Sequence, residues 1–346
     1  METSQEIQER MLLNVSEDYD TSEGSFIYDA LKPAAIEFEN QQKEVETVQS
    51  KLDVENLTGD ELTRFVYTRT GITRKPATKA SGIVTISGSI GSSINIGDLV
   101  SDGYINFVSL EEKTIGESGQ MTIWVECEEY GIVGNVTANS ITVFPVTIQG
   151  LVDVYNQNAF TNGYDAESDD DLRQRYYDKL QRPGKAGNKY HYREWAMEVT
   201  GTGDARVFPC YNGPLSVKVV VIDSNKQPAN ESLIKSVQQH IEDEMPFGVT
   251  DLSVISASAL KINLTVTLSI MSDYIEANVI EMIKANITQY LSDITFTSTF
   301  VSYAKIGSII IDSEGVLDYE NLLVNGDTSN VPIGDEQVAI MGGVNE

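Results

Sequence analysis

The sequence predicts a multidomain α+β protein with an N-terminal helical segment, an inserted antiparallel β domain and two C-terminal α/β sandwich domains. Three observations support this class. A chain of 346 residues exceeds what one hydrophobic core usually holds. The apolar pattern changes from helical to strand periodicity near residue 80, and helices and strands alternate from about residue 159. We therefore expect domains at residues 1–79, 80–150, 151–258 and 259–346.

The N-terminal segment carries a heptad pattern, in which apolar residues alternate at steps of four and three. Its members are Ile27, Leu31, Ala34, Phe38, Gln41, Val45, Val48 and Leu52. One helix cannot bury such a seam against itself, so the pattern predicts partner helices that contact Ile27, Leu31, Phe38, Val45, Val48 and Leu52. Packing against the chain's own domains is the alternative. The polar Gln41 would suit the specification of register in an assembly.

Short β-branched segments separated by Gly, Ser, Asn and Asp follow the linker GITRKPATKASG. They predict an antiparallel sheet with tight turns, and they are GIVTISG, INIGDLV, YINFVSL, MTIWVEC and ITVFPVTI. The glycines of GSIGSSINIG do not form a phosphate-binding loop, because the segment lacks the required Lys and the strand-to-helix context. The glycines are therefore expected in turns.

The remaining sequence predicts alternating elements. Helices are expected at 168–182, 188–200, 232–244 and 276–292, and strands at 205–209, 216–223, 251–256 and 261–270. Short strands and turns are expected after residue 292. This order favours two small sheets, each with helices on one face.

The composition bounds the function. With 52 acidic and 24 basic residues the net charge is −28, which repels a nucleic-acid backbone. The N-terminus METSQEIQER lacks a signal-peptide pattern, and no apolar run approaches the roughly 18 residues of a membrane span. We expect synthesis in the cytoplasm, without insertion into a membrane. Cys127 and Cys210 are far apart and are expected to be core thiols.

In the acidic run DAESDDD, Asp165, Glu167, Asp169 and Asp171 alternate as the ligands of a calcium-binding loop do. A calcium loop needs Gly at its sixth position and a bidentate acid at its twelfth, where this chain has Asp170 and Tyr176. The run is better explained as the start of a helix, with Ser168 and Asp171 forming a capping box. No metal ion, cofactor or catalytic residue is predicted.

The segment AGNKYHYREWAMEVTG gathers a histidine, a tryptophan and several charged residues. His191 precedes Glu194 by one helical turn, but His240 is the only other imidazole in the sequence and no nucleophile motif is present. Tyr192, Trp195 and Val199 share one helix face, so the cluster is predicted to be a packing face, in a domain core or at a contact between subunits.

Several separated motifs carry a resemblance to a known family. The order GYDAESDDDLRQRYYDKLQRPGKAGNKYHYREWAMEVTGTGDARVFPCYNGPLSVKVVVID, followed by MPFGVTDLSVISA, resembles the core signature of the baseplate J-like family. This family comprises wedge proteins of contractile phage tails and tail-like particles. EGSFIYDALKPAAIEFENQQKEV and TGDELTRFVYTRTGITRKPATKASG resemble its N-terminal helical part, and NIGDLVSDGYINFVS with EEYGIVGNVTANSI resembles its sheet domain. The segment FVSYAKIGSIIIDSEGVLDYENLLVNG resembles its C-terminal domain.

The resemblance implies structural work in an assembly. It implies that the N-terminal helices bundle with a companion helical wedge subunit, and that the C-terminal domains pair with a second copy to close a ring around the tail hub. Receptor binding would then expand the ring and release contraction of the sheath. Two alternatives remain: a receptor-binding or adhesin-like tail component with a Gly/Ser-rich sheet domain, and a cell-wall hydrolase using carboxylates such as Glu194 and Asp171.

Overall fold

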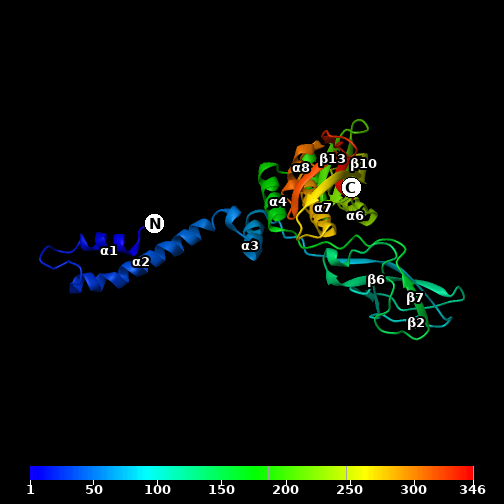
Figure 1. Ribbon diagram of the computed structural model, residues 1–346, viewed down its shortest axis with the longest axis horizontal. Coiled ribbons are helices and arrows are strands. Elements are labelled where there is room, and N and C mark those ends of the chain that lie inside the picture. Colours follow the sequence, from blue (N-terminus) through cyan, green and yellow to red (C-terminus); the bar gives the residue numbers. More distant parts are fainter. Residues whose placement is uncertain (186, 247, 346) are drawn as a thin grey trace. The chain divides into compact units, whose positions relative to one another are not determined.

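The computed structural model describes residues 1–185, 187–246 and 248–345 (Figure 1). Helices form the N-terminal part, an antiparallel β domain follows, and two mixed α/β domains complete the chain. This confirms the predicted fold class. The residues group into two units, of which the first contains Met1–Thr73 and Ser168–Tyr177 and the second contains Arg74–Glu167 and the chain from Asp178 onward.

The first unit is helical. Its elements are α1 (Ser4–Leu12), α2 (Phe26–Ser50), the 3-10 helix η1 (Val54–Asn56), α3 (Gly59–Thr70) and the first part of α4 (Asp169–Gln181). Thr3 and Glu6 form a capping box at the start of α1. The Ser25 side chain accepts a hydrogen bond from the Tyr28 backbone N–H at the start of α2. α1 and α2 therefore each begin after a residue whose side chain satisfies a free backbone donor.

A small core joins η1 and α3 to the first part of α4. Buried residues from the two segments pack together: Val54, Leu57, Leu62 and Val66 from the first, and Leu172 and Tyr176 from the second. Arg173 donates hydrogen bonds to the Val54 and Leu57 carbonyl oxygens at 3.2 and 3.0 Å. The first part of α4 thus packs with the helical segment, although the expected domain of residues 151–258 had included it.

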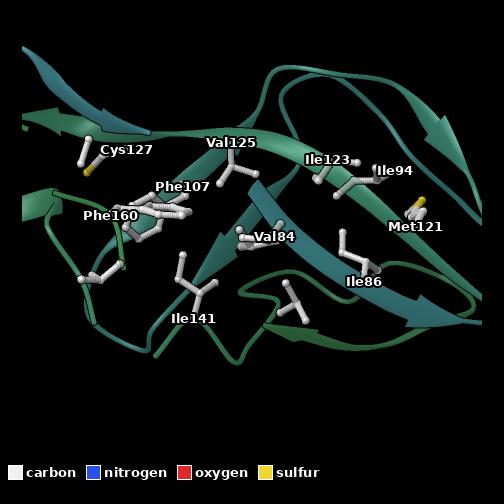
Figure 2. Close-up of a cluster of buried hydrophobic side chains, with 14 of the residues drawn as sticks. Val84, Ile86, Ile94, Phe107, Met121, Ile123, Val125, Cys127, Ile141 and Phe160 are labelled. Carbon is white, nitrogen blue, oxygen red and sulfur yellow. The ribbon is translucent and has the colours of Figure 1, made fainter. Parts of the chain in front are cut away.

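The β domain is built on a five-stranded antiparallel sheet in the order β3-β4-β6-β1-β7. Its strands are β1 (Lys79–Gly88), β3 (Leu99–Ser101), β4 (Asn106–Ser109), β6 (Gln120–Tyr130) and β7 (Leu151–Tyr155), and a separate pair joins β2 (Ser93–Ile94) to β5 (Lys113–Thr114). Alternate residues of β1 and β6 enter one core, where Val84, Ile86, Ile123 and Val125 pack together (Figure 2). Period-two alternation in the sequence therefore corresponds to one buried face.

Two expectations for this domain were wrong. The segment ITVFPVTI forms no strand and makes a single β-bridge, between Val143 and Ser101, because Pro145 lacks the N–H that a ladder needs. The domain also continues past residue 150: β7 pairs with β1, and Phe160 lies in the same core as Phe107. The 3-10 helix η2 (Ile132–Gly134) packs beside β1 and β6.

The middle α/β domain contains a three-stranded sheet in the order β10-β9-β8. Its elements are α5 (Lys189–Glu198), β8 (Thr202–Pro209), β9 (Ser216–Asp223), α6 (Glu231–Glu244) and β10 (Asp251–Ser256). α5 and α6 cover one face of the sheet, where Val219 and Val221 contact Trp195 and Val237 within one core. The predicted helices and strands are confirmed to within three residues at each end.

The C-terminal domain is organised around β11 (Ser258–Ile270). This strand runs parallel to β15 (Gln337–Asn345) and antiparallel to β13 (Val316–Val324). α7 (Glu276–Asp293) and α8 (Tyr303–Ile311) pack on one face through a row of isoleucines that includes Ile283, Ile306 and Ile310. β12 (Phe300–Val301) pairs with β14 (Val331–Pro332). α8 corrects the expectation of short strands after residue 292, because its β-branched sequence YAKIGSIII is helical where its apolar face meets β13.

The second face of the middle sheet meets the C-terminal domain. Val220 and Ile222 of β9 pack against Val338 and Ile340 of β15. Arg206 supports this contact by donating to the Phe296 carbonyl oxygen at 2.8 Å. Because both of its faces are covered, β9 is a nearly continuous apolar run.

The end of β9 contains a buried titratable group. Asp223 accepts hydrogen bonds from the Asn225 and Gln227 backbone N–H groups, and burial raises its pKa to about 7. The hydrogen bonds from Gln227 and Asn225, and after them the positive charge of Lys226, oppose this rise in pKa. The pKa of Tyr164 is raised as well, mainly by burial and then by the charge of Asp223. The folded state therefore binds the Asp223 proton more tightly than the unfolded chain.

This difference predicts a pH dependence of stability. The pKa of Asp223 in the folded protein lies above its ordinary value of 3.8. Its contribution to the free energy of unfolding is therefore fully present below pH 3.8 and is lost as the pH rises through about 7. Asp223→Asn should remove this pH-dependent change in the free energy of unfolding, which amounts at most to a few kcal/mol. Urea unfolding between about pH 5 and about pH 8 measures it, with the exposed Glu242→Gln as the control. An equal slope in wild type and Asp223→Asn would contradict the prediction.

Candidate functional site

α1 and α2 form a helical hairpin at the start of the chain. Ile7 and Ala35 are buried between them. The Ser4 backbone N–H donates to Glu39 Oε2 at 2.8 Å, and Gln8 Nε2 donates to the Tyr28 carbonyl oxygen at 2.7 Å. These contacts fix α1 on one stripe of α2.

Glu39 has a role of its own in this hairpin. Lys43, one turn later on α2, pairs with its carboxylate at 2.7 Å. Hydrogen bonds from Lys43 and then from Ser4 lower the pKa of Glu39 to about 2. The carboxylate therefore stays charged at neutral pH, and it satisfies a free N–H group in the first turn of α1.

The heptad seam divides into two parts. Ile27 and Leu31 are half-buried in the half of α2 that α1 covers. Phe38 is 48% exposed, Val45 and Val48 are each 65% exposed, and Leu52 is 70% exposed. The backbone N–H of Glu2, just before α1, donates a hydrogen bond to Gln42 Oε1. Beyond Gln42, an apolar stripe remains that α1 does not cover. We call it the open seam, and it consists of Val45 and Val48 of α2 and of Leu52, which lies two residues after α2 ends.

Two of the charged residues beside the seam are acidic, and the third, Lys51 before Leu52, forms an ion pair with Glu61 at 2.5 Å. Glu37 and Glu44 directly precede Phe38 and Val45, which places both carboxylates at the edge of the seam, and both side chains are exposed. The polar Gln41 is exposed as well. The arrangement can bind a helix through apolar contacts in the centre and charge pairs at the margin.

The aromatic cluster on α5 belongs to the core of the middle domain. Trp195 is 5% exposed, Tyr192 is buried beside it, and Val199 packs against the same core. The His191 ring stacks on Trp195 with centroids 3.9 Å apart. Of the two readings of this face, the structure places Tyr192, Trp195 and Val199 in a domain core.

The polar groups near this cluster have structural partners. Glu194 forms an ion pair with Lys179 and accepts from the Gly184 N–H at 3.3 Å. His191 Nδ1 faces the Gly187 N–H at 3.3 Å, while His240 pairs with Glu198 at 2.8 Å. The two imidazoles therefore serve different contacts. Within the described ranges, no three His, Cys, Asp or Glu side chains are grouped to hold a metal ion.

Acidic residues of DAESDDD bind backbone donors. Asp165 accepts from the Ile132 N–H, Glu167 from the Lys75 N–H and Asp169 from the Gly59 N–H, at 3.0, 3.1 and 3.0 Å. Ser168 Oγ accepts from the Asp171 N–H at 3.0 Å, as expected of a helix N-cap. The sequence indicated the cap, but it gave no signal for the contacts that depend on residues about 30 to 110 positions away.

The two cysteines differ. Cys127 is buried in the β-domain core, as predicted, and burial raises the pKa of its thiol. Cys210 is exposed, so the expectation of a core thiol was wrong at this position. It lies just after β8 with a positive φ of 59°, where the chain turns towards β9.

Comparison with known proteins identifies the family. Three models match in chain order: the baseplate J-like protein barrel domain at residues 83–163, the baseplate J-like central domain at 184–256, and the baseplate J-like protein C-terminal domain at 262–345. The phage-like element PBSX protein XkdT of Bacillus subtilis is 30% identical over 99% of this chain and 97% of its own length. The chain belongs to the baseplate J-like family.

Two further matches are more distant. The baseplate protein gp47 of Escherichia phage Mu is 30% identical over 46% of this chain and 46% of its own length. A chain of the anti-feeding prophage baseplate, solved by electron cryomicroscopy, aligns over 98% of this chain and 89% of that chain, with 12% identity and a TM-score of 0.41. No helix in the described part of this baseplate J-like chain has both the length and the apolar character needed to cross a membrane.

Proposed function

We propose that the protein is a structural wedge subunit in the baseplate of a contractile phage tail or tail-like particle. Its α2 bundles with a companion helical wedge subunit, and its C-terminal α/β domains pair with a second copy in a ring around the tail hub. The ring transmits the contraction trigger to the sheath-proximal baseplate proteins. The observation that carries this proposal is the open seam of α2 in a member of the baseplate J-like family.

The open seam supports a helical partner. Val45 and Val48 lie three residues apart on one face of α2, and Leu52 follows at the next step of four, two residues after α2 ends. Apolar side chains at these positions gain stability when a second helix removes them from water, at roughly 25 cal/mol per Å² buried. Glu37 and Glu44 favour a companion helix with Lys or Arg at the positions that face them, whereas Lys51 beside Leu52 is paired with Glu61 of this chain.

The proposal assigns no catalytic residue and no cofactor. Glu194 is occupied by Lys179 and the Gly184 N–H, and Asp171 takes part in the cap of α4. Neither carboxylate is thus placed as a free acid or base of a hydrolase. The function is carried by interfaces, which a ring needs in repeated copies. The subunit is made in the bacterial cytoplasm, assembles into the baseplate there and leaves the cell on lysis.

Electron microscopy of a producing strain tests the proposal. Deleting this gene alone should leave loose tubes, sheath or hub fragments without an assembled baseplate, and a plasmid copy should restore the particles. Intact contractile particles that fail to attach to cells would instead support the adhesin-like alternative. Clearing of peptidoglycan by the purified protein would support the hydrolase.

A further inference from the structure

The outer face of the β-domain sheet carries a row of apolar side chains. Val84, Ile86, Ile123 and Val125 point into the core, so the residues that alternate with them face outward. Among these, Ile83 lies directly opposite Trp124 in the β1–β6 ladder.

The row continues across a third strand. The Leu110 N–H donates to the Trp124 carbonyl oxygen at 2.9 Å, which extends the β4–β6 pairing by one position. Leu110, Trp124 and Ile83 are 44%, 40% and 51% exposed. With strands about 4.8 Å apart, the three side chains span about 10 Å. Tyr155 of β7, opposite Thr85, extends the apolar surface on the β1 side. We call Leu110, Trp124, Ile83 and Tyr155 the outer patch.

The composition of the outer patch departs from its surroundings. The neighbouring outward positions of β1 hold Ser81, Thr85 and Ser87, as a solvated sheet face normally does. Single exposed apolar residues are common and need no explanation, whereas adjacent ones that include Trp and Tyr are characteristic of interaction sites. Trp and Tyr are also the residue types that contribute most often to binding energy in protein interfaces.

The charges around the outer patch select the partner. Glu126 and Glu128 follow Trp124 on the same face of β6, and Asp153 lies on the outward side of β7. Residues 80–163 contain nine acidic residues and one lysine, Lys113. The nearby Lys79 lies 3.9 Å from Glu126 and offsets part of this charge. A second copy would bring the same carboxylates to the contact, and anionic lipids or nucleic acids would be repelled.

We propose that the outer patch docks a protein partner whose apolar contact residues are surrounded by Lys and Arg. The outer patch lies on the β-domain sheet, whereas the open seam lies along α2. The inference rests on the proposed function, because the partner is expected among the proteins of the baseplate.

Photocrosslinking in the full-length protein tests the inference. A photoreactive amino acid replaces Trp124 in a producing strain, and a second strain carries it at Tyr104, which is 96% exposed in the same domain. After irradiation, crosslinked peptides are identified in purified particles and in the free protein fraction. We expect position 124 to crosslink to another protein, at a segment with more Lys and Arg than Asp and Glu, and position 104 not to reach that segment.

A charge reversal adds a second measurement. Glu126→Lys with Glu128→Lys should lower the crosslink yield from position 124 by about tenfold or more, because the basic rim of the partner is then repelled. The exposed Glu117→Lys in the turn before β6 should leave the yield unchanged. Circular dichroism melting of each variant shows whether it has folded.

The outcomes separate this inference from the proposed function. A crosslink to a second copy or to an acidic segment, no crosslink in either fraction, or an unchanged yield after charge reversal in folded protein would overturn the inference. A basic partner found in the free fraction, with the protein absent from particles, would contradict the baseplate role and support the docking site.

Discussion

Replacing Val45 with aspartate is expected to abolish association of the protein with its helical partner. The side chain lies beyond the part of α2 that contacts α1, so the stability of the free chain should stay within about 0.5 kcal/mol of wild type. In the bundle, the carboxylate would be buried at a heptad position without a counter-charge. Such a burial costs about 3–5 kcal/mol, which weakens binding by about a hundredfold or more.

Gradient sedimentation of lysates from a complemented deletion strain measures this effect as the fraction of the protein found with tail particles. Asn40→Asp is the matched control, because it adds the same charge at an exposed position of α2 outside the seam. An equal share of Val45→Asp and wild-type protein in particles would remove the open seam from the proposed function.

Phe107→Ala is expected to cause the largest loss of stability within the β domain. Phe107 is fully buried, and its ring meets Phe160 edge to face with centroids 5.6 Å apart (Figure 2). Removing the ring leaves a cavity in a core that relaxes incompletely, at a cost of about 3–5 kcal/mol. Because Phe160 follows β7, the loss also weakens the contact that holds the end of this domain to its sheet.

Urea unfolding followed by circular dichroism measures the change, with Ile90→Ala as the control because Ile90 is 68% exposed in the same domain. The control should change the free energy of unfolding by about 0.5 kcal/mol or less. A loss below about 1 kcal/mol for Phe107→Ala would show that this aromatic pair does not stabilise the domain.

The strongly periodic elements could be predicted from the sequence. β9 and β10 end where expected, and α6 and α7 differ by a single residue at one end. Each has an apolar pattern whose period matches its type of secondary structure, and α6 also begins at a capping Asn230. Local hydrogen bonding and side-chain direction fix such elements before any distant contact forms.

The predictions that were wrong concern segments whose structure depends on contacts with residues far away in the sequence. α8 has a β-branched sequence that favours a strand, but packing of its apolar face over β13 holds it as a helix. β7 looked like the start of the next domain because the chain leaves the sheet after β6 and returns to β1 after about 20 residues. The exposure of Cys210 depends on a turn conformation that composition does not report.

The candidate site shows the same division. The heptad pattern by itself determined that α2 carries a seam, and helical spacing determined that Tyr192 and Trp195 share a face of α5, which ends just before Val199. Only the tertiary structure decided which half of the seam α1 covers, that the α5 face lies in a core, and that Leu110, Trp124 and Ile83 meet on one face of a sheet. The physical reason is that periodicity fixes the direction of a side chain on its own element, whereas burial depends on which distant element packs there.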